Sequence, residues 1–341
     1  PKRAGLLYAG TNRGVHVSFD DGESWRSLQL NLPTTGINDL LAHGDDLIVA
    51  TQGRAIWALD VVEPLRQLAI AEASGGVERH RPTLLQPAPA VRLRANQNRD
   101  TPLPPEEPRG ENPPTGAVID YLLPVAARGP IVLEVFDGAG ARVRRFASDE
   151  LPDRPRAGVY FADRWLAEPD LPATTAGHHR FVWDLRRERP RALDYDYSIA
   201  ALPGKETPPS PQGALVPPGS YEVRLTVDGV ELRQPVTVVA DPRVSFTAAD
   251  YDETAGFQGN VATLLADSAT LAAAIGGFEA RLRPAAETSE GRDARSLAEV
   301  RHRLGELRSG DDPAAVNGRL SGLAADLESS DSRPTVPQRE L

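Results

Sequence analysis

Short apolar or alternating runs, each five to seven residues long, dominate the first sixty residues. They cover residues 6–11, 14–18, 37–43, 46–51 and 55–60. Turn-forming residues separate the last three runs: Gly44-Asp45 follows the run 37–43, and Gln52-Gly53-Arg54 follows the run 46–51. Runs of this length with such breaks are typical of antiparallel strands, so residues 1–70 are predicted to form two sets of short strands.

The strand pattern stops between residues 71 and 115 and returns after that. Six prolines lie between positions 102 and 114, which predicts an extended, surface-lying connector. Residues 116–242 then predict one β-sandwich, with an insertion over 186–214 that is too long for a tight loop. Its expected strands are 117–123, 131–136, 142–146, 179–185, 220–227 and 230–239.

A helical period replaces the strand pattern after Pro242. The apolar stripe of a first long helix advances by four and three residues in turn, and it comprises Phe257, Val261, Leu264, Ser268, Leu271, Ile275, Phe278 and Leu282. Thr247 is expected to cap this helix, and Asp312-Pro313 opens the last of three. Residues 247–328 therefore predict a helical hairpin or small bundle, with a partner chain as the alternative, and 329–341 a disordered tail.

One octapeptide, from Ser18 to Trp25, carries a recognisable motif. Ser18, Asp20, Gly22 and Trp25 fit the pattern S-x-D-x-G-x-x-W of the Asp box, and the segment resembles the Asp-box turns of BNR and sialidase-like β-propellers. The resemblance implies a structural turn, in which the serine and aspartate side chains bind turn amides and the tryptophan packs between blades. It implies an architecture and no reaction.

Further along the chain, a second stretch resembles the closing blade of such propellers. Gly53, Arg54, Trp57 and Asp60 match the G-R-x-x-W-x-L-D ending of the Vps10/sortilin-like group. The segment that begins at Pro217 resembles the entry strand of FlgD-like, immunoglobulin-like domains. The expected fold class is therefore mainly β: a remnant of closing propeller blades, an Ig-like sandwich and a C-terminal helical hairpin or bundle.

Composition limits the chemistry and the partners that this chain can have. The chain has 341 residues, no cysteine and a net charge of −10, which excludes thiolate chemistry and disfavours nucleic acid as a partner. No run of about 18 apolar residues occurs, so we expect no segment that spans a membrane. Because the chain starts at Pro1 and contains no methionine, we expect the C-terminal part of a longer protein, whose upstream blades would be its main partner. The family resemblance implies a secreted or periplasmic location.

Two groups of residues are weak candidates for ligand binding. Asn96, Asn98 and Asp100 have an alternating spacing like that of calcium loops, although they lack the glycine and distal glutamate of an EF-hand. The Asp194-Tyr195-Asp196-Tyr197 stretch would place two carboxylates on one side of an extended chain and two phenols on the other, to contact a sugar or a cation. The alternatives are backbone-binding side chains and a loop anchored by its tyrosines.

Three functions are compatible with this sequence, which lacks the common signatures of hydrolase elbows, zinc peptidases and nucleotide sites. The first is a non-catalytic region that binds a peptide or glycan and braces the propeller. The second is the accessory part of a sialidase-like glycoside hydrolase whose active site lies upstream. The third is an assembly module that dimerises through its helices.

Overall fold

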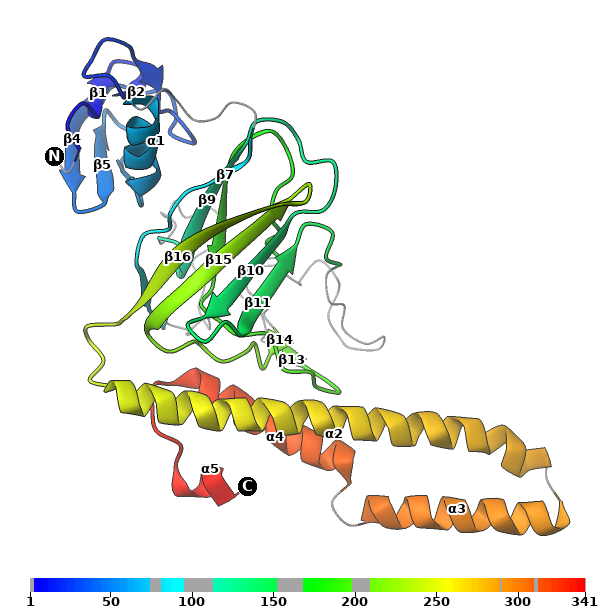
Figure 1. The fold of residues 1–341 in the computed structure, drawn as a ribbon. Coiled ribbons are helices and arrows are strands. Elements are labelled where there is room, and N and C mark those ends of the chain that lie inside the picture. The colour runs from blue at the N-terminus through cyan, green and yellow to red at the C-terminus, as the bar shows by residue number, and fades with distance from the viewer. Residues whose placement is uncertain are drawn as a thin grey trace.

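The computed structural model describes residues 3–73, 81–94, 113–151, 168–197, 209–288, 290–309 and 312–340. Helices and strands occupy similar shares of these residues, so the fold is mixed α and β instead of mainly β. The expected order of β-sheets followed by C-terminal helices is present; the helical share is larger than expected because these helices are long and because one further helix follows the first strands. The sheets and the helical part form successive layers along the chain (Figure 1).

Two small antiparallel sheets open the chain. The first contains β1 (Leu7–Thr11), β2 (Gly14–Ser18) and β3 (Arg26–Ser27); the second contains β4 (Ile37–His43), β5 (Asp46–Thr51) and β6 (Ile56–Leu59). Alternation along β2 and β5 buries Val15, Leu47 and Val49 in a shared apolar cluster. The two sheets therefore form one packed unit.

Helix α1 (Glu63–Ala73) follows these sheets and was not predicted; it spans the expected boundary at residue 70 between the strand region and the connector. Glu63 and Pro64 occupy its first turn, and both residue types favour helix N-termini. Ala69 is 1% exposed on the packed side of the helix. Pro64 was a local signal for this helix, but residues 63–70 were assigned to the strand region 1–70.

The expected connector 71–115 is also wrong in part, because it supplies two strands to the sheets that follow. Strand β7 (Thr83–Leu84) pairs with β9, and β8 (Ala90–Arg92) pairs in parallel with β16. Strands of two or three residues show no period, and prolines beside them are tolerated because both strands lie at sheet edges. Most of the proline run lies outside the described residues.

Two sheets face each other in the central part of the fold (Figure 1). The larger has the order β11-β10-β15-β16-β8 and the smaller β12-β9-β7. Their remaining strands are β9 (Ala117–Leu123), β10 (Val132–Asp137), β11 (Arg142–Ala147), β12 (Gly177–Trp183), β15 (Gly219–Val227) and β16 (Val230–Ala240). All six strands expected between 116 and 242 are present, with ends that differ by at most two residues.

The core of this central part lies between the two sheets. Trp183, Ile119, Leu133 and Leu225 are completely buried there. The Trp183 indole donates to the carbonyl oxygen of Arg186 at 3.0 Å, which satisfies its one polar atom. Within the insertion, a two-stranded sheet joins β13 (Asp196–Tyr197) and β14 (Pro209–Ser210).

The C-terminal part is helical, as the period predicted. It comprises α2 (Ala248–Thr288), α3 (Gly291–Ser309), α4 (Pro313–Ser329) and α5 (Val336–Glu340). Thr247 and Asp250 exchange side-chain-to-backbone hydrogen bonds in a capping box, and the Asp312 carboxylate accepts from the amide of Ala314. Both predicted helix starts are confirmed.

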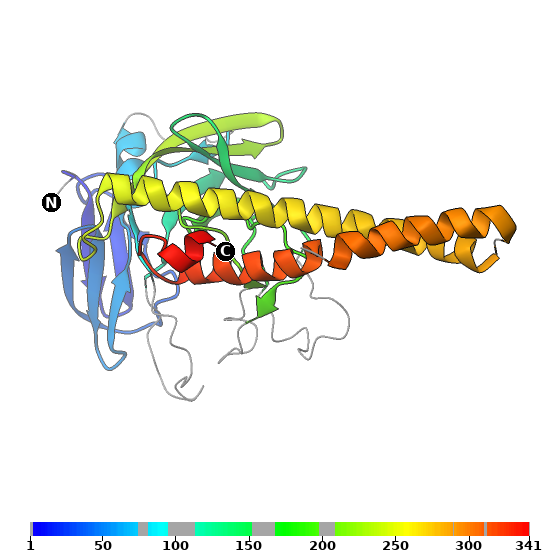
Figure 2. The same cartoon turned by 90° about the horizontal axis from the view of Figure 1, so that it is seen from below.

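The expected disordered tail, 329–341, is ordered through residue 340. Asp331 binds two arginines of the sheet region, Arg333 binds Asp250, and α5 follows. The prediction was wrong because these partners are distant in sequence. Figure 2 shows α4 beside α2 under the sheets, while the rest of α2 extends outward with α3. The helix over residues 248–285 contains an 18-residue window with a mean hydropathy of 1.5, so by length and composition alone it would suffice to cross a membrane, contrary to the expectation from sequence.

Candidate functional site

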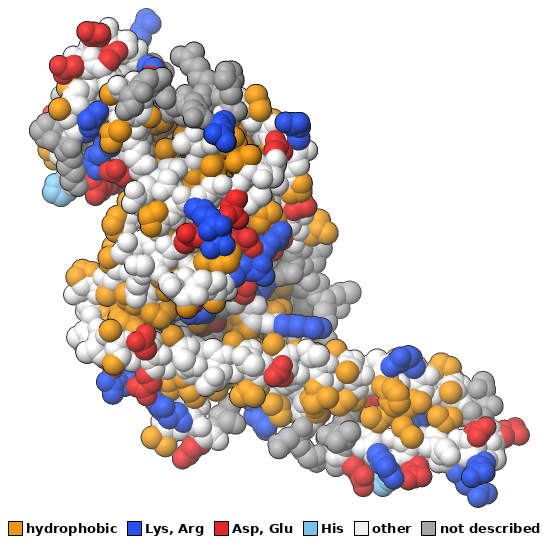
Figure 3. Space-filling model, in the orientation of Figure 1, with side chains coloured by type: hydrophobic (Ala, Val, Ile, Leu, Met, Phe, Trp, Pro, Cys, Tyr) orange, Lys and Arg blue, Asp and Glu red, His pale blue; other side chains and the backbone are white. Residues whose placement is uncertain are grey.

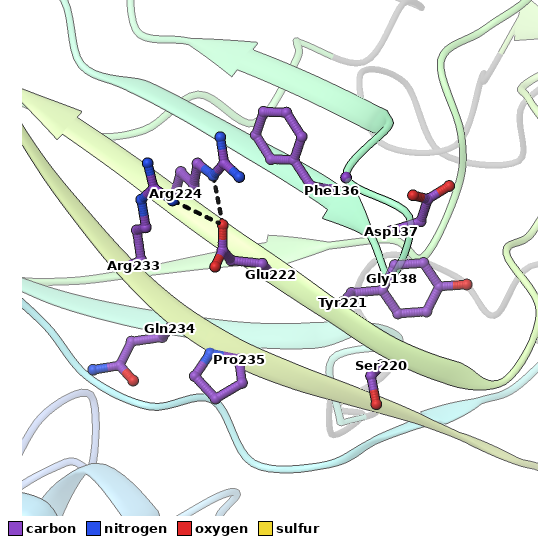
Figure 4. Close-up of a pocket in the computed structure, with 11 residues that line it drawn as sticks. Phe136, Asp137, Gly138, Ser220, Tyr221, Glu222, Arg224, Arg233, Gln234 and Pro235 are labelled. Carbon is purple, nitrogen blue, oxygen red and sulfur yellow. Dashed lines mark hydrogen bonds and ion pairs between the residues drawn. The ribbon is translucent and has the colours of Figure 1, made fainter.

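A shallow groove of about 420 Å³ lies on the outer face of the larger sheet (Figure 4). It is lined by Phe136, Asp137, Gly138, Gly140, Ser220, Tyr221, Glu222, Arg224, Arg233, Gln234 and Pro235. Strand alternation along β15 turns Val223 and Leu225 into the core and Glu222 and Arg224 out to solvent. The groove is therefore built from the polar positions of central strands, which a rigid sheet holds in place.

Glu222 lies between two arginines in this groove. Its Oε1 accepts from Arg224 Nε at 2.6 Å and lies 3.7 Å from Arg233 Nη1 (Figure 4). The Arg224 guanidinium also stacks on Phe136, 3.8 Å from the ring centroid. The Arg233 side chain is about half exposed, and its guanidinium also forms an ion pair with Glu231. Charged side chains gather over this sheet in Figure 3.

The groove is suited to binding. The Asp137 carboxylate accepts from the amides of Ala139 and Ala141, so the turn already uses it. The exposed guanidinium of Arg233 and the hydroxyl of Ser220 can donate to a carboxylate or to sugar hydroxyls. The lining residues include no histidine, and the two lining acids are held by arginines and turn amides. This geometry can accommodate a polar or anionic ligand.

The Asp-box residues form a closed hydrogen-bonded turn between β2 and β3. The Ser18 hydroxyl donates to Asp20 Oδ1 at 2.8 Å and accepts from the Gly22 amide at 2.9 Å, while Asp20 Oδ1 also accepts from the Ser24 amide at 2.9 Å. Gly22 has a φ of 97°, a conformation that favours glycine. Trp25 is 43% exposed in this chain. The Ser18 and Asp20 side chains thus stabilise the turn.

The stability of the Asp-box turn is expected to depend on pH through the Asp20 carboxylate. Hydrogen bonds from the Ser24 side chain and amide and from Ser18 lower the pKa of Asp20 to about 2 from an ordinary value of 3.8. Because the pKa is depressed in the folded state, the stabilisation is present above pH 4 and is lost as the pH falls through 2. We expect Asp20→Asn to lower the melting temperature at pH 7.

Thermal unfolding between pH 7 and pH 2 checks this expectation. The difference between the wild type and Asp20→Asn should shrink below pH 4 and vanish near pH 2. The control is Asp39→Asn, which removes an exposed carboxylate that accepts only from the neighbouring amide of Leu40. A difference that stays constant down to pH 2 would show that the ionised Asp20 carboxylate does not stabilise the turn.

The second predicted motif forms the β5–β6 turn and the exit from β6. Gly53 has a φ of 75°, the amide of Arg54 donates to Thr51 Oγ1 at 3.0 Å, and Trp57 Nε1 donates to the Arg54 carbonyl at 2.7 Å. The Arg54 side chain itself is exposed. Asp60 lies apart from this turn, at the boundary with the smaller sheet, where burial and the nearby Asp46 raise its pKa.

An unpredicted cluster joins Asp60 to the central sheets. Arg180 on β12 donates to the carbonyl oxygens of Asp60 and Val61 at 3.2 and 3.4 Å, and it is held by Asp120 on β9 at 3.1 and 3.2 Å. Burial would raise the pKa of Asp120, but hydrogen bonds from His178 and Arg180 outweigh it and keep that pKa below its usual value. A lone aspartate in the apolar run 117–123 was the signal, since a buried charge requires a partner.

In the Asp194–Tyr197 stretch, the two aspartates are exposed and the two tyrosines are half-buried. The Tyr195 hydroxyl donates to the carbonyl oxygen of Pro190 at 2.9 Å and accepts from the amide of Ala192, while Arg189 lies over its ring. Asp196 and Tyr197 pair with β14 instead, and burial raises the pKa of Tyr197. Tyr195 thus anchors the insertion, which agrees with the alternative given in the sequence analysis.

The calcium candidates Asn96, Asn98 and Asp100 lie outside the described residues, so the structure does not test them. In the part of the chain that the structure describes, no group of three or more histidine, aspartate or glutamate side chains could hold a metal ion. The weak calcium hypothesis stays a prediction from sequence.

A second unpredicted cluster joins the larger sheet to the helices. Arg92, only 4% exposed, donates to the Val216 carbonyl at 2.8 Å and to Asp331 at 2.7 Å, and Arg94 contacts the same carboxylate at 2.9 Å. Glu328 accepts from the amides of Gln212 and Gly213 at 2.8 and 2.9 Å. Burial raises the pKa of Glu328, which the two amides and nearby arginines oppose.

A scan of the sequence against protein-family models finds no match, and a search of curated proteins finds none. The resemblance to BNR-repeat proteins therefore stays a prediction that rests on motifs within the chain.

Proposed function

We propose that this chain is the non-catalytic C-terminal part of a BNR-repeat β-propeller exoprotein, secreted or periplasmic, that braces the propeller and binds a peptide or glycan. In this proposal the two N-terminal sheets belong to the terminal blades, and the facing sheets form an Ig-like sandwich. The closed Asp-box turn and the Gly53–Trp57 turn support the blade assignment, because both use their motif residues for internal hydrogen bonds.

The observation that carries the bracing role is the position of Arg180. Its guanidinium binds the chain directly after β6, through the carbonyl oxygens of Asp60 and Val61, and Asp120 fixes it from within the smaller sheet. A second contact supports the same junction, since the side-chain amide of Gln67 on α1 exchanges two hydrogen bonds with the backbone of Gln86, both 2.8 Å long. The sandwich thereby holds the end of the last blade.

Replacing Arg180 with methionine tests this role. Hydrogen bonds from a charged donor are each worth about 1.5–3 kcal/mol, so the amides of β5 and β6 should exchange about tenfold faster in hydrogen-exchange mass spectrometry. The control is Arg142→Met, which breaks a surface pair with Glu134 on the same sandwich. If exchange in residues 46–59 matches the control while only β9 and β12 loosen, Arg180 stabilises the sandwich alone and the bracing role is wrong.

The groove on the larger sheet is the ligand-binding surface in this proposal. Arg233→Ala should weaken the binding of an oligogalacturonate at least fivefold in titration calorimetry, because the exposed guanidinium is the main donor for a carboxylate there. Arg145→Ala, on β11 outside the groove, is the matched control. The same titration with a neutral maltooligosaccharide and with a glutamate-rich peptide distinguishes an acidic glycan from a neutral glycan and from an acidic peptide as the ligand. Equal affinities for Arg233→Ala and the control would place binding elsewhere.

A further inference from the structure

The apolar stripe predicted for α2 is divided between two faces of the helix. Val261 and Leu265 are buried against Leu320 and Leu323 of α4. Leu264, Leu271 and Phe278 are instead 55%, 53% and 40% exposed. These three side chains are spaced seven residues apart, and this spacing places them in one line along a helix that pairs with another helix.

The exposed line has few charges around it. Between Thr254 and Phe278 the only charged residue of α2 is Asp267, and just 17% of the most apolar window of this helix is buried. Hydrophobic side chains gather along the outer part of the helical arm in Figure 3. A solvated helix normally has a charged outer face, so this face is of the kind that a partner covers.

The arm is free of the sheets over its outer half. Asn317, in the second turn of α4, donates to the carbonyl oxygen of Leu265 at 2.8 Å and to Ser268 Oγ at 2.9 Å, and α4 begins four residues before it, at Pro313. Beyond that point, α3 is the described element that packs on α2, and the two extend away from the sheets (Figure 2). From Ser268 to Thr288 the helix rises about 30 Å, enough for several turns of contact.

Two opposite charges lie symmetrically about Ala274 on the same part of α2. Asp267 precedes Ala274 by seven residues, and Arg281 follows it by seven. An antiparallel copy of α2 with its two-fold axis beside Ala274 would place each Asp267 next to the other copy's Arg281. The same register places Leu271 opposite Gly277, which has no side chain to obstruct it. The charges and the apolar line are thus self-complementary, as a two-fold interface requires.

We propose that α2 and α3 form a homodimerisation arm, in which the exposed line of one chain packs antiparallel on the same line of a second copy. The two bodies then lie at opposite ends of the paired arms. An anionic lipid surface fits less well, since the chain has a net charge of −10 and Asp267 lies beside the line. The inference goes beyond the proposed function, and it does not depend on Arg180 or on the groove.

Sedimentation equilibrium between 1 and 200 μM, combined with charge reversal, tests the proposal. The wild type should reach twice the monomer mass within this range. Asp267→Arg and Arg281→Asp should each raise the dissociation constant about tenfold, and the double variant should restore it. Leu271→Glu should give a monomer, whereas Ile56→Glu, at a 74% exposed residue of β6, should leave the dimer unchanged.

Three outcomes would overturn the proposal. These are a wild-type monomer up to 200 μM, a double charge reversal that does not restore association, and association that Ile56→Glu weakens as much as Leu271→Glu. Co-sedimentation of a monomeric wild type with phosphatidylcholine–phosphatidylglycerol vesicles, lost in Leu271→Glu, would assign the line to a lipid surface instead. Circular dichroism of each variant verifies that the helices are retained.

Discussion

Trp183→Ala is expected to lower the free energy of unfolding of the sandwich by about 4 kcal/mol. The indole is completely buried between the two sheets and meets the ring of Tyr221 edge-on, with 5.6 Å between the centroids. Its removal leaves a cavity, and it also leaves the carbonyl oxygen of Arg186 without its donor. Both effects act in the same direction, so this substitution should be among the most damaging in the chain.

Urea unfolding followed by far-ultraviolet circular dichroism measures this loss, and hydrogen exchange in β9 and β12 assigns it to the sandwich. Trp25→Ala is the matched control, because that indole is 43% exposed and should cost far less. Equal losses of unfolding free energy for the two variants would mean that the core between the two sheets collapses into the cavity and avoids most of its cost.

Asp331→Ala is expected to cost about 3 kcal/mol, because it leaves a buried charge without its partner. Asp331 is the carboxylate that binds both Arg92 and Arg94, and Arg92 is 4% exposed under the ring of Tyr251. After the substitution, Arg92 keeps its hydrogen bond to Val216 but has no adjacent counter-ion at that position. The C-terminal segment should then separate from the larger sheet.

Thermal unfolding and limited proteolysis after residue 329 measure this effect. Asp326→Ala removes an exposed carboxylate from the same region and is the control. Combining Asp331→Leu with Arg92→Met should recover part of the lost stability, since replacing a whole buried pair costs less than breaking it. A loss below about 1 kcal/mol for Asp331→Ala would show that solvent reaches Arg92 and that the pair contributes as a surface ion pair does.

Elements with a regular period and a clear boundary were predicted well from sequence. The six longer strands between 117 and 240 and both helix caps are where the pattern placed them. Two of the failures share one cause. Strands β7 and β8 are too short to show a period, and the segment around Asp331 is ordered by arginines more than two hundred positions earlier. A local pattern cannot reveal a partner that is distant in the chain.

The candidate sites follow the same division. The Asp-box turn could be predicted because each of its hydrogen bonds joins residues at most four positions apart. The groove, the Arg180 junction and the Arg92 cluster could not, since each combines side chains from strands or helices that are far apart in sequence.

The periodic elements, the local turns and the net charge could be read from the sequence, because they depend on neighbouring residues and on composition. The folded structure was needed to see which polar side chains are buried, which are paired and which half of the α2 stripe is exposed, because burial and pairing depend on which elements pack together. Leu264 and Leu265 are neighbours in the sequence, yet Leu265 is buried in the contact with α4 and Leu264 lies on an exposed face. Only the position of α4 distinguishes them.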